Sequence, residues 1–271
     1  SVDKVNLSFL ANASYVKNEI KNLGNQTGYI DKESLPTLGT VSRNENGYPI
    51  GYFFGYKAIG VFQTQEEIDN YISPATGKPI QPNAAPGDTK FEDLNGDGVI
   101  SDDNEDRTMI GKPNPDWIVG LTVAADWNGF DLSAFFQGSF GADVFDALRR
   151  YELAAVNYTS DALERWTGPG TSNSMPRIVL GDTPKNFRPS TLLVHDASFL
   201  RLRNLQVGYT LPAQLTRKAY IQRLRFYASF DNLLTITGYK GMDPEIGSTM
   251  GIDKGVYPQA RVYTFGLNLT F

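Results

Sequence analysis

The last ten residues of the chain alternate between apolar side chains and mostly small or polar ones. One set of alternate positions holds Tyr263, Phe265, Leu267, Leu269 and Phe271, and the other holds Val262, Thr264, Gly266, Asn268 and Thr270. Successive side chains of a β-strand point to opposite faces, so this order gives the strand one apolar face. About nine residues of a tilted strand span the hydrocarbon core of a bilayer. The segment therefore predicts the closing strand of a transmembrane β-barrel.

Six other segments have a similar character, although residues 47–63 are less regular, and together they give seven predicted strands. The seven are residues 5–15, 47–63, 117–127, 130–137, 197–211, 223–231 and 262–271. Arg223 and Arg225 share one face of their strand. An arginine on the lipid face at the bilayer midplane costs about 2–4 kcal/mol, so we expect this face to point into the barrel. Asn128-Gly129 joins two of the strands and is a strong hairpin signal.

The segment 197–211 departs from simple alternation. Arg201 and Arg203 occupy the same parity as the apolar residues from Leu205 onward. Either the lipid-facing part of the strand begins near residue 204, or a β-bulge shifts the register. We favour the first interpretation, because charged side chains at the membrane rim can reach water.

The connections between the predicted strands alternate between short and long. Short connections occur at 127–129 and 212–220, and long ones, assigned to the extracellular side, at about 64–116, 140–196 and 233–257. Short periplasmic turns and long outer loops are typical of bacterial barrels. Residues 18–46 do not fit, because they are too long for a periplasmic turn. Short helices are expected within the outer loops at 65–71, at 142–155 and around 162–166.

Seven strands cannot form a barrel alone, since the smallest bacterial barrels have about eight strands and the count is even. An open sheet in lipid would leave the backbone groups of two edge strands unpaired. We therefore expect residues 1–271 to be the C-terminal part of one larger barrel domain, without a signal peptide. A soluble β-sandwich is the alternative, since it also has alternating strands and Gly-rich turns.

The composition excludes several classes of protein. The net charge of −5 provides no basic surface for nucleic acid. The chain has no cysteine, which removes disulfides and thiolate sites, and His195 is its single histidine. His195-Asp196 lies near serines, but the strained Gly-x-Ser-x-Gly turn of a hydrolase is missing. We expect no enzymatic activity and no organic cofactor.

Residues 93–100 match the first eight positions of a calcium-binding EF-hand loop. Asp93, Asn95 and Asp97 supply side-chain oxygens at the first, third and fifth positions, and Val99 offers its backbone carbonyl at the seventh. The twelfth position lacks the bidentate carboxylate of that loop, so we expect Asp106 to close the site. The pattern predicts a structural Ca²⁺ ion. A tight polar turn that binds nothing is the alternative.

Three aromatic residues in the long loops are weak candidates for stacking on sugar rings: Tyr151, Tyr158 and Trp166. Single exposed aromatic side chains are common on protein surfaces, so packing of the loops is an equally simple role.

Several motifs together resemble the SusC/RagA family of TonB-linked outer-membrane receptors. They lie at residues 91–100, 106–107, 110–115, 130–133, 137–138, 198–204, 208–212, 231–234 and 257–271. The similarity extends over about residues 47–271. The Asp106-Arg107 pair lies further from the Asp-Gly turn than is usual in the family, which puts the last calcium ligand in doubt.

The resemblance implies a barrel of about 22 strands, of which this chain holds roughly the last seven, and an N-terminal plug domain outside this chain. It also implies energy-coupled import of oligosaccharides or peptides across the outer membrane of a Gram-negative bacterium. The implied partners are a SusD-like surface lipoprotein, the TonB energy-coupling protein, the remaining strands and plug, and outer-membrane lipid. The alternatives are a soluble calcium-stabilised carbohydrate-binding or adhesion module and a surface barrel that acts only as an adhesin.

Overall fold

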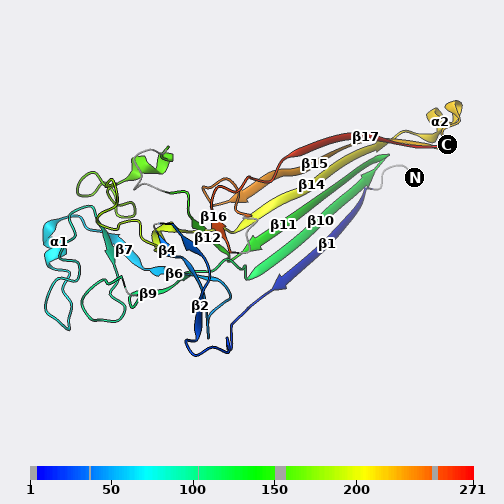
Figure 1. Ribbon diagram of the computed structural model, residues 1–271. Coiled ribbons are helices and arrows are strands. Elements are labelled where there is room, and N and C mark those ends of the chain that lie inside the picture. Colours follow the sequence, from blue (N-terminus) through cyan, green and yellow to red (C-terminus); the bar gives the residue numbers. More distant parts are fainter. Residues whose placement is uncertain (1–4, 37, 103, 150–156, 246–249) are drawn as a thin grey trace.

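The structure is a computed structural model that describes residues 5–36, 38–102, 104–149, 157–245 and 250–271. Its largest element is a six-stranded antiparallel sheet. The six strands lie side by side in the same order as in the sequence. In spatial order the strands are β1 (Asn6–Tyr15), β10 (Trp117–Trp127), β11 (Phe130–Phe140), β14 (Phe199–Thr210), β15 (Arg223–Thr237) and β17 (Val262–Thr270). Figure 1 shows these long strands extending from a region of loops at one end to the start of β1 and the end of β17 at the other.

Residues 47–63 are not part of this sheet, so the prediction of a seventh long strand was wrong. They form β6 (Tyr52–Tyr56) and β7 (Ala58–Val61), which belong to smaller sheets. All five residues of β6 are buried. A strand that is covered on both faces has no reason to alternate, which explains the irregular pattern of this segment.

The connections between the six long strands now alternate without exception. The long connections are residues 16–116, 141–198 and 238–261, which we call the first, second and third excursions; the short ones are residues 128–129 and 211–222. Residues 18–46, which did not fit as a periplasmic turn, lie inside the first excursion. All three long connections therefore lie at one end of the sheet, and both short connections lie at the other.

The register of the sheet separates apolar from polar side chains across all six strands. One cross-strand row consists of Phe9, Val123, Ala134, Leu205, Phe230 and Tyr263. The adjacent row, on the other face, consists of Ser8, Ala124, Ser133, Gln206, Ser229 and Thr264. We call these the apolar face and the polar face. Large side chains of the apolar face are exposed, and Phe265 reaches 76%; so large an exposed apolar surface indicates contact with lipid or another protein.

A β-bulge at Arg203 keeps this separation intact along β14. The pairing with β11 passes from Asn204 to Leu202, and the pairing with β15 skips the same residue. The shift places Leu200 and Leu202 on the apolar face with Leu205. Our preference for a lipid-facing part that begins near residue 204 was wrong, and the bulge is the correct explanation.

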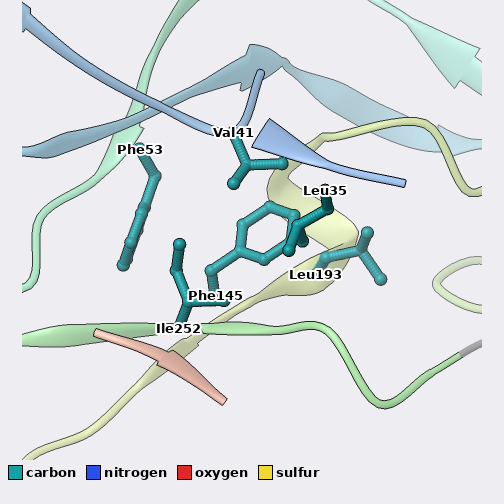
Figure 2. Packing of buried hydrophobic residues seen from close by; sticks show 6 residues of the cluster. All are labelled: Leu35, Val41, Phe53, Phe145, Leu193 and Ile252. Atoms are coloured by element: carbon teal, nitrogen blue, oxygen red, sulfur yellow. The ribbon is translucent and has the colours of Figure 1, made fainter. Parts of the chain in front are cut away.

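The three excursions pack together at one end of the sheet (Figure 1). Their shared core contains Leu35, Val41 and Phe53 of the first excursion, Phe145 and Leu193 of the second and Ile252 of the third. Figure 2 shows these side chains converging from different segments of the chain. The rings of Phe53 and Phe145 lie 5.9 Å apart. Segments far apart in sequence are thus joined by one apolar cluster.

Short strands build the rest of this region. One four-stranded sheet has the order β2 (Tyr29–Asp31), β5 (Ser42–Glu45), β6 and β9 (Arg107–Gly111). A second sheet has the order β13 (Val194–Asp196), β12 (Asp143–Asp146) and β16 (Ile252–Asp253), in which β12 and β16 are parallel. Two pairs complete the set: β3 (Ser34–Leu35) with β4 (Gly39–Thr40), and β7 with β8 (Thr89–Phe91).

Among the residues that the structure describes, helical structure is limited to short segments. They are α1 (Gln65–Asp69), α2 (Ala213–Thr216), and the 3-10 helices η1 (Ser160–Glu164), η2 (Thr191–Leu193) and η3 (Arg217–Ala219). The Thr64 hydroxyl caps α1 by accepting a hydrogen bond from the Glu67 N–H. The helix expected at 142–155 is not formed over Asp143–Asp146, which is strand β12, and residues 150–156 lie outside the described residues. Within the described part of the chain, no helix has the length and hydropathy needed to span a membrane.

We predict that Phe53→Ala loosens the packing of all three excursions. Removing a fully buried phenylalanine typically costs about 3–5 kcal/mol of stability. Limited trypsin digestion of the purified protein should then cleave residues 16–116, 141–198 and 238–261 faster than in the unmodified protein. Ile59→Ala, at an exposed position, is the control. Equal digestion of the Phe53 variant and the control would contradict a shared core.

Candidate functional site

The predicted calcium loop is a compact series of turns held by its own carboxylates. Asp93 accepts hydrogen bonds from the N–H groups of Gly96 and Gly98, at 2.8 and 2.9 Å. The Asp97 carboxylate accepts from the Val99 N–H at 2.8 Å. The Asn95 amide nitrogen donates to Asp97 and to Glu105, at 3.1 and 2.8 Å. The bonds from the backbone of Gly96, Gly98 and Val99 are the local side-chain to backbone contacts by which Asx-turns form.

Asp106 closes the loop from its C-terminal end. Its carboxylate is fully buried and accepts from the N–H groups of Leu94 and Ser101, at 3.1 and 3.0 Å. Asp106 thereby links the two ends of the loop that contains the predicted ligand residues. Among the described residues, no group of three or more His, Asp or Glu side chains is arranged to hold a metal ion. The calcium site stays a prediction.

The aromatic candidates differ in their surroundings. Trp166 donates from Nε1 to the Gln63 side chain at 3.1 Å, which links the second excursion to the first. A Cβ atom at Gly87 would lie 2.4 Å from the Trp166 ring, so the ring packs directly against this glycine. Tyr158 is 45% exposed, and Tyr151 lies outside the described residues. Trp166 thus has a packing role, and sugar binding by any of the three stays a prediction.

His195 lies in β13 beside a cavity of about 400 Å³. Its Nε2 atom is buried, has no hydrogen-bond partner in the described structure, and lies 3.9 Å from the Asp146 carboxylate. Burial, and next the charge of Arg149, lower the pKa of His195, and Asp146 opposes this shift. Arg149 itself bridges Asp146 and Asp161, at 2.8 and 2.7 Å. This arrangement is a charged cluster between loop segments.

A second buried cluster joins the first two excursions at Asp88. Arg177 donates to this carboxylate from Nε at 2.7 Å, and Asn186 donates to it at 3.0 Å. The ion pair with Asp88 raises the pKa of Arg177. Asp88 is almost fully buried, so removing Arg177 would leave an uncompensated carboxylate charge in the interior.

Sequence reasoning missed the ion-pair network on the polar face. Arg201 is 2% exposed and donates to Asp243, to Glu245 and to the Thr235 hydroxyl. Arg203 donates to Glu245 as well. These contacts hold the third excursion against β14. The sequence feature that could have indicated this network is the pair of arginines at 201 and 203. The bulge at Arg203 places the Arg201 side chain on the polar face.

A second ion pair crosses the polar face nearer the other end of the sheet. Asp131 of β11 and Arg225 of β15 reach over the intervening strand, with contacts of 2.6–2.9 Å. Gly208 of β14 lies between them, and a Cβ atom there would be 2.2 Å from an Asp131 oxygen. The glycine therefore makes room for a charge pair that spans three strands.

Comparison with known proteins gives relatives of one kind. The chain is 35% identical over 236 residues to TonB-dependent receptor P3 of Formosa agariphila, a match that covers 83% of this chain and 22% of the relative. It is 30% identical over 263 residues to TonB-dependent receptor SusC of Bacteroides thetaiotaomicron, with coverage of 96% and 24%. The chain thus spans about a quarter of the length of these curated relatives. No family model matches.

Solved structures give the same result. The RagAB peptide transporter superposes with a TM-score of 0.73 at 28% identity, over 98% of this chain and 27% of that one. The RagAB peptide importer in its open-open state gives a TM-score of 0.72 at 26% identity, over 100% and 27%.

The His195 cluster predicts a pH dependence of the loop region. The folded-state pKa lies below the ordinary value of 6.5, so the unfolded state binds more protons between the two values. The stability that the loop region gains from keeping His195 neutral is fully present above pH 6.5, and it is lost as the pH falls through the folded-state pKa. We expect faster proteolysis of the 141–198 segment at pH 5 than at pH 7.5. The rates are divided by the cleavage rate of an unfolded peptide at the same pH, which corrects for the change in protease activity. His195→Gln should weaken this dependence, and an unchanged dependence would contradict the assignment to His195.

Proposed function

We propose that this chain, which belongs to the SusC/RagA family of TonB-dependent receptors, forms the C-terminal wall of an outer-membrane β-barrel that imports nutrients. The observation that supports this most strongly is the six-stranded sheet, whose apolar face is exposed and whose polar face holds charged pairs. In a barrel the apolar face meets lipid and the polar face lines the interior. The edge strands β1 and β17 would pair with the strands that complete the barrel.

The three excursions fit the extracellular side of such a barrel. They lie together at one end of the sheet, whereas the two short connections lie at the other. Short periplasmic turns and long outer loops are the usual arrangement in bacterial barrels. A SusD-like lipoprotein would contact the excursions from outside, by analogy with the relatives, and TonB would act through the plug outside this chain.

The cargo is proposed only as a class. SusC and the RagAB peptide transporter are the relatives that bear on it, and we propose import of oligosaccharides or peptides. We assign no catalytic role to any residue. A soluble module remains the alternative, but an exposed face that includes Phe9, Phe226 and Phe265 disfavours it in water.

A pair of adjacent substitutions tests the membrane assignment. Leu205 lies on the apolar face and Gln206 on the polar face of the same strand. We expect Leu205→Arg in the full-length receptor to lose about 2–4 kcal/mol of stability in the bilayer, and Gln206→Arg to lose much less. Outer-membrane fractionation and heat-modifiable gel mobility measure the folded fraction. Equal folded fractions for both variants, or a parent protein that stays soluble without detergent, would contradict the proposal.

We also propose that the 93–106 loop holds a structural Ca²⁺ ion, since residues 93–100 match the first eight positions of a calcium-binding loop and all the proposed donors are oxygens. The ion would be held by Asp93, Asn95, Asp97, Asp106 and the Val99 carbonyl. We expect EGTA to accelerate proteolysis of this loop in the receptor, and added Ca²⁺ to reverse the effect. Asp93→Asn should abolish the response, while the exposed Asp69→Asn should retain it. Equal proteolysis with and without chelator would contradict a bound ion.

A further inference from the structure

The short connection at residues 211–222 carries exposed apolar and exposed cationic side chains together. Leu215 is 59% exposed, and Tyr220 is 91% exposed. Arg217 and Lys218 lie between them in the sequence and are exposed as well. The connection contains no acidic residue, and neither cation pairs with a carboxylate in the described part of the chain. Basic residues mixed with exposed apolar ones are typical of segments that lie at a membrane surface.

This connection is a folded turn built from α2 and η3. The Tyr220 N–H donates to the Arg217 carbonyl at 3.1 Å, and Thr216 is buried beneath the turn. The Gln222 N–H donates to the Thr270 carbonyl at 2.8 Å, which ties the turn to the end of β17. The backbone therefore holds the exposed side chains in place beside the sheet.

A row of aromatic residues crosses the apolar face next to the short connections. It consists of Trp127, Phe130, Tyr209 and Phe226, which pair in turn across four strands. The rings of Phe130 and Tyr209 lie 4.4 Å apart. Aromatic side chains of membrane barrels form girdles where the apolar band meets the headgroups. This row therefore marks the membrane boundary at the end of the sheet that carries the short connections.

A second aromatic row marks the boundary at the other end of the sheet. Tyr15, Trp117 and Phe140 pair in turn on the same apolar face. Trp117 and Trp127 are the first and last residues of β10, which has 11 residues. At about 3.3 Å per residue and a tilt of about 40–45°, this length corresponds to a height of about 25 Å, which is the usual height of the apolar band.

The turn begins immediately outside this band. Leu211 follows Tyr209 by two positions, and its N–H donates to the Leu224 carbonyl at 2.9 Å. Figure 1 shows α2 beyond the ends of the long strands, at the end opposite to the excursions. Residues 211–222 are therefore at the depth of the lipid headgroups. An acidic protein surface would also attract the two cations, but the position of the turn beside the aromatic row favours lipid.

We propose that residues 211–222 bind the headgroup layer of the bilayer and prefer anionic phospholipid. Leu215 and Tyr220 would enter the boundary between headgroups and acyl chains. Arg217 and Lys218 would form charge-assisted hydrogen bonds with lipid phosphates, and the negative potential of an anionic surface attracts both cations. The inference rests on the proposed function, because it requires the apolar face of the sheet to lie in lipid.

The test uses the full-length receptor with a fluorophore attached at Ala219→Cys, reconstituted in phosphatidylcholine vesicles. One set of vesicles contains brominated phosphatidylcholine, and the other contains the same fraction of brominated phosphatidylglycerol. The ratio of the two quenching extents gives the preference for the anionic lipid. The test variant is Arg217→Gln/Lys218→Gln. The matched control is Lys32→Gln/Lys78→Gln, which removes two exposed cations of the first excursion.

We expect both lipids to quench the label, and the anionic lipid to be preferred by at least about threefold, as two surface cations allow. The test variant should lose this preference and still be quenched by phosphatidylcholine, while the control should keep it. Leu215→Gln/Tyr220→Gln should weaken quenching by both lipids.

An inserted receptor whose label neither lipid quenches would overturn the proposal, because the turn would then project into water, for a protein partner or for none. Equal quenching by the two lipids, or a preference that persists in the test variant, would overturn it as well. Heat-modifiable mobility of the same preparations reports insertion separately. An inserted receptor with any of these results contradicts this inference alone, whereas a receptor that does not insert contradicts the proposed function too.

Discussion

The register between neighbouring strands is the constraint on which the rest of the molecule depends. Each residue of a strand faces one side only, so an error of one position would exchange the apolar and polar faces. In this chain the separation continues across six strands, from Phe9 to Tyr263 on one face. The bulge at Arg203 preserves it where β14 would otherwise carry Arg201 onto the apolar face. The polar face can then hold Arg201, Asp243 and Glu245 as a buried network.

The three excursions form a separately packed region at one end of this sheet. Their apolar core draws on all three segments, as the packing of Phe53, Phe145 and Ile252 shows (Figure 2). Buried charges are paired where they join segments, as Asp88 and Arg177 are.

The parts of the fold that follow from local alternation were predictable. The hairpin at Asn128-Gly129 and the strand ending at Thr270 needed only period-two patterns and turn chemistry. The place of residues 47–63 could not be predicted, because β6 is buried on both faces and therefore lacks the alternation of apolar and polar residues that marks a strand of the large sheet. The turns at Asp93 and Asp97 follow from their spacing. The ion pair of Asp88 with Arg177 could not be predicted from the sequence, since it depends on how two excursions pack.

A cysteine scan of β14 in the full-length receptor tests most directly whether the sheet has a lipid-facing and an inward-facing side. Residues 1–271 contain no cysteine, so each introduced cysteine is the only one in this part of the receptor. Single cysteines at residues 199–207 would carry a fluorophore that brominated lipids quench. We expect quenching at 200, 202, 205 and 207, and protection at 199, 201, 204 and 206, with the phase changing at the bulge. Quenching at 201, 203, 205 and 207 would mean that no bulge changes the register, and no quenching at any position would mean that neither face meets lipid. Either result would contradict a sheet with one lipid-facing side.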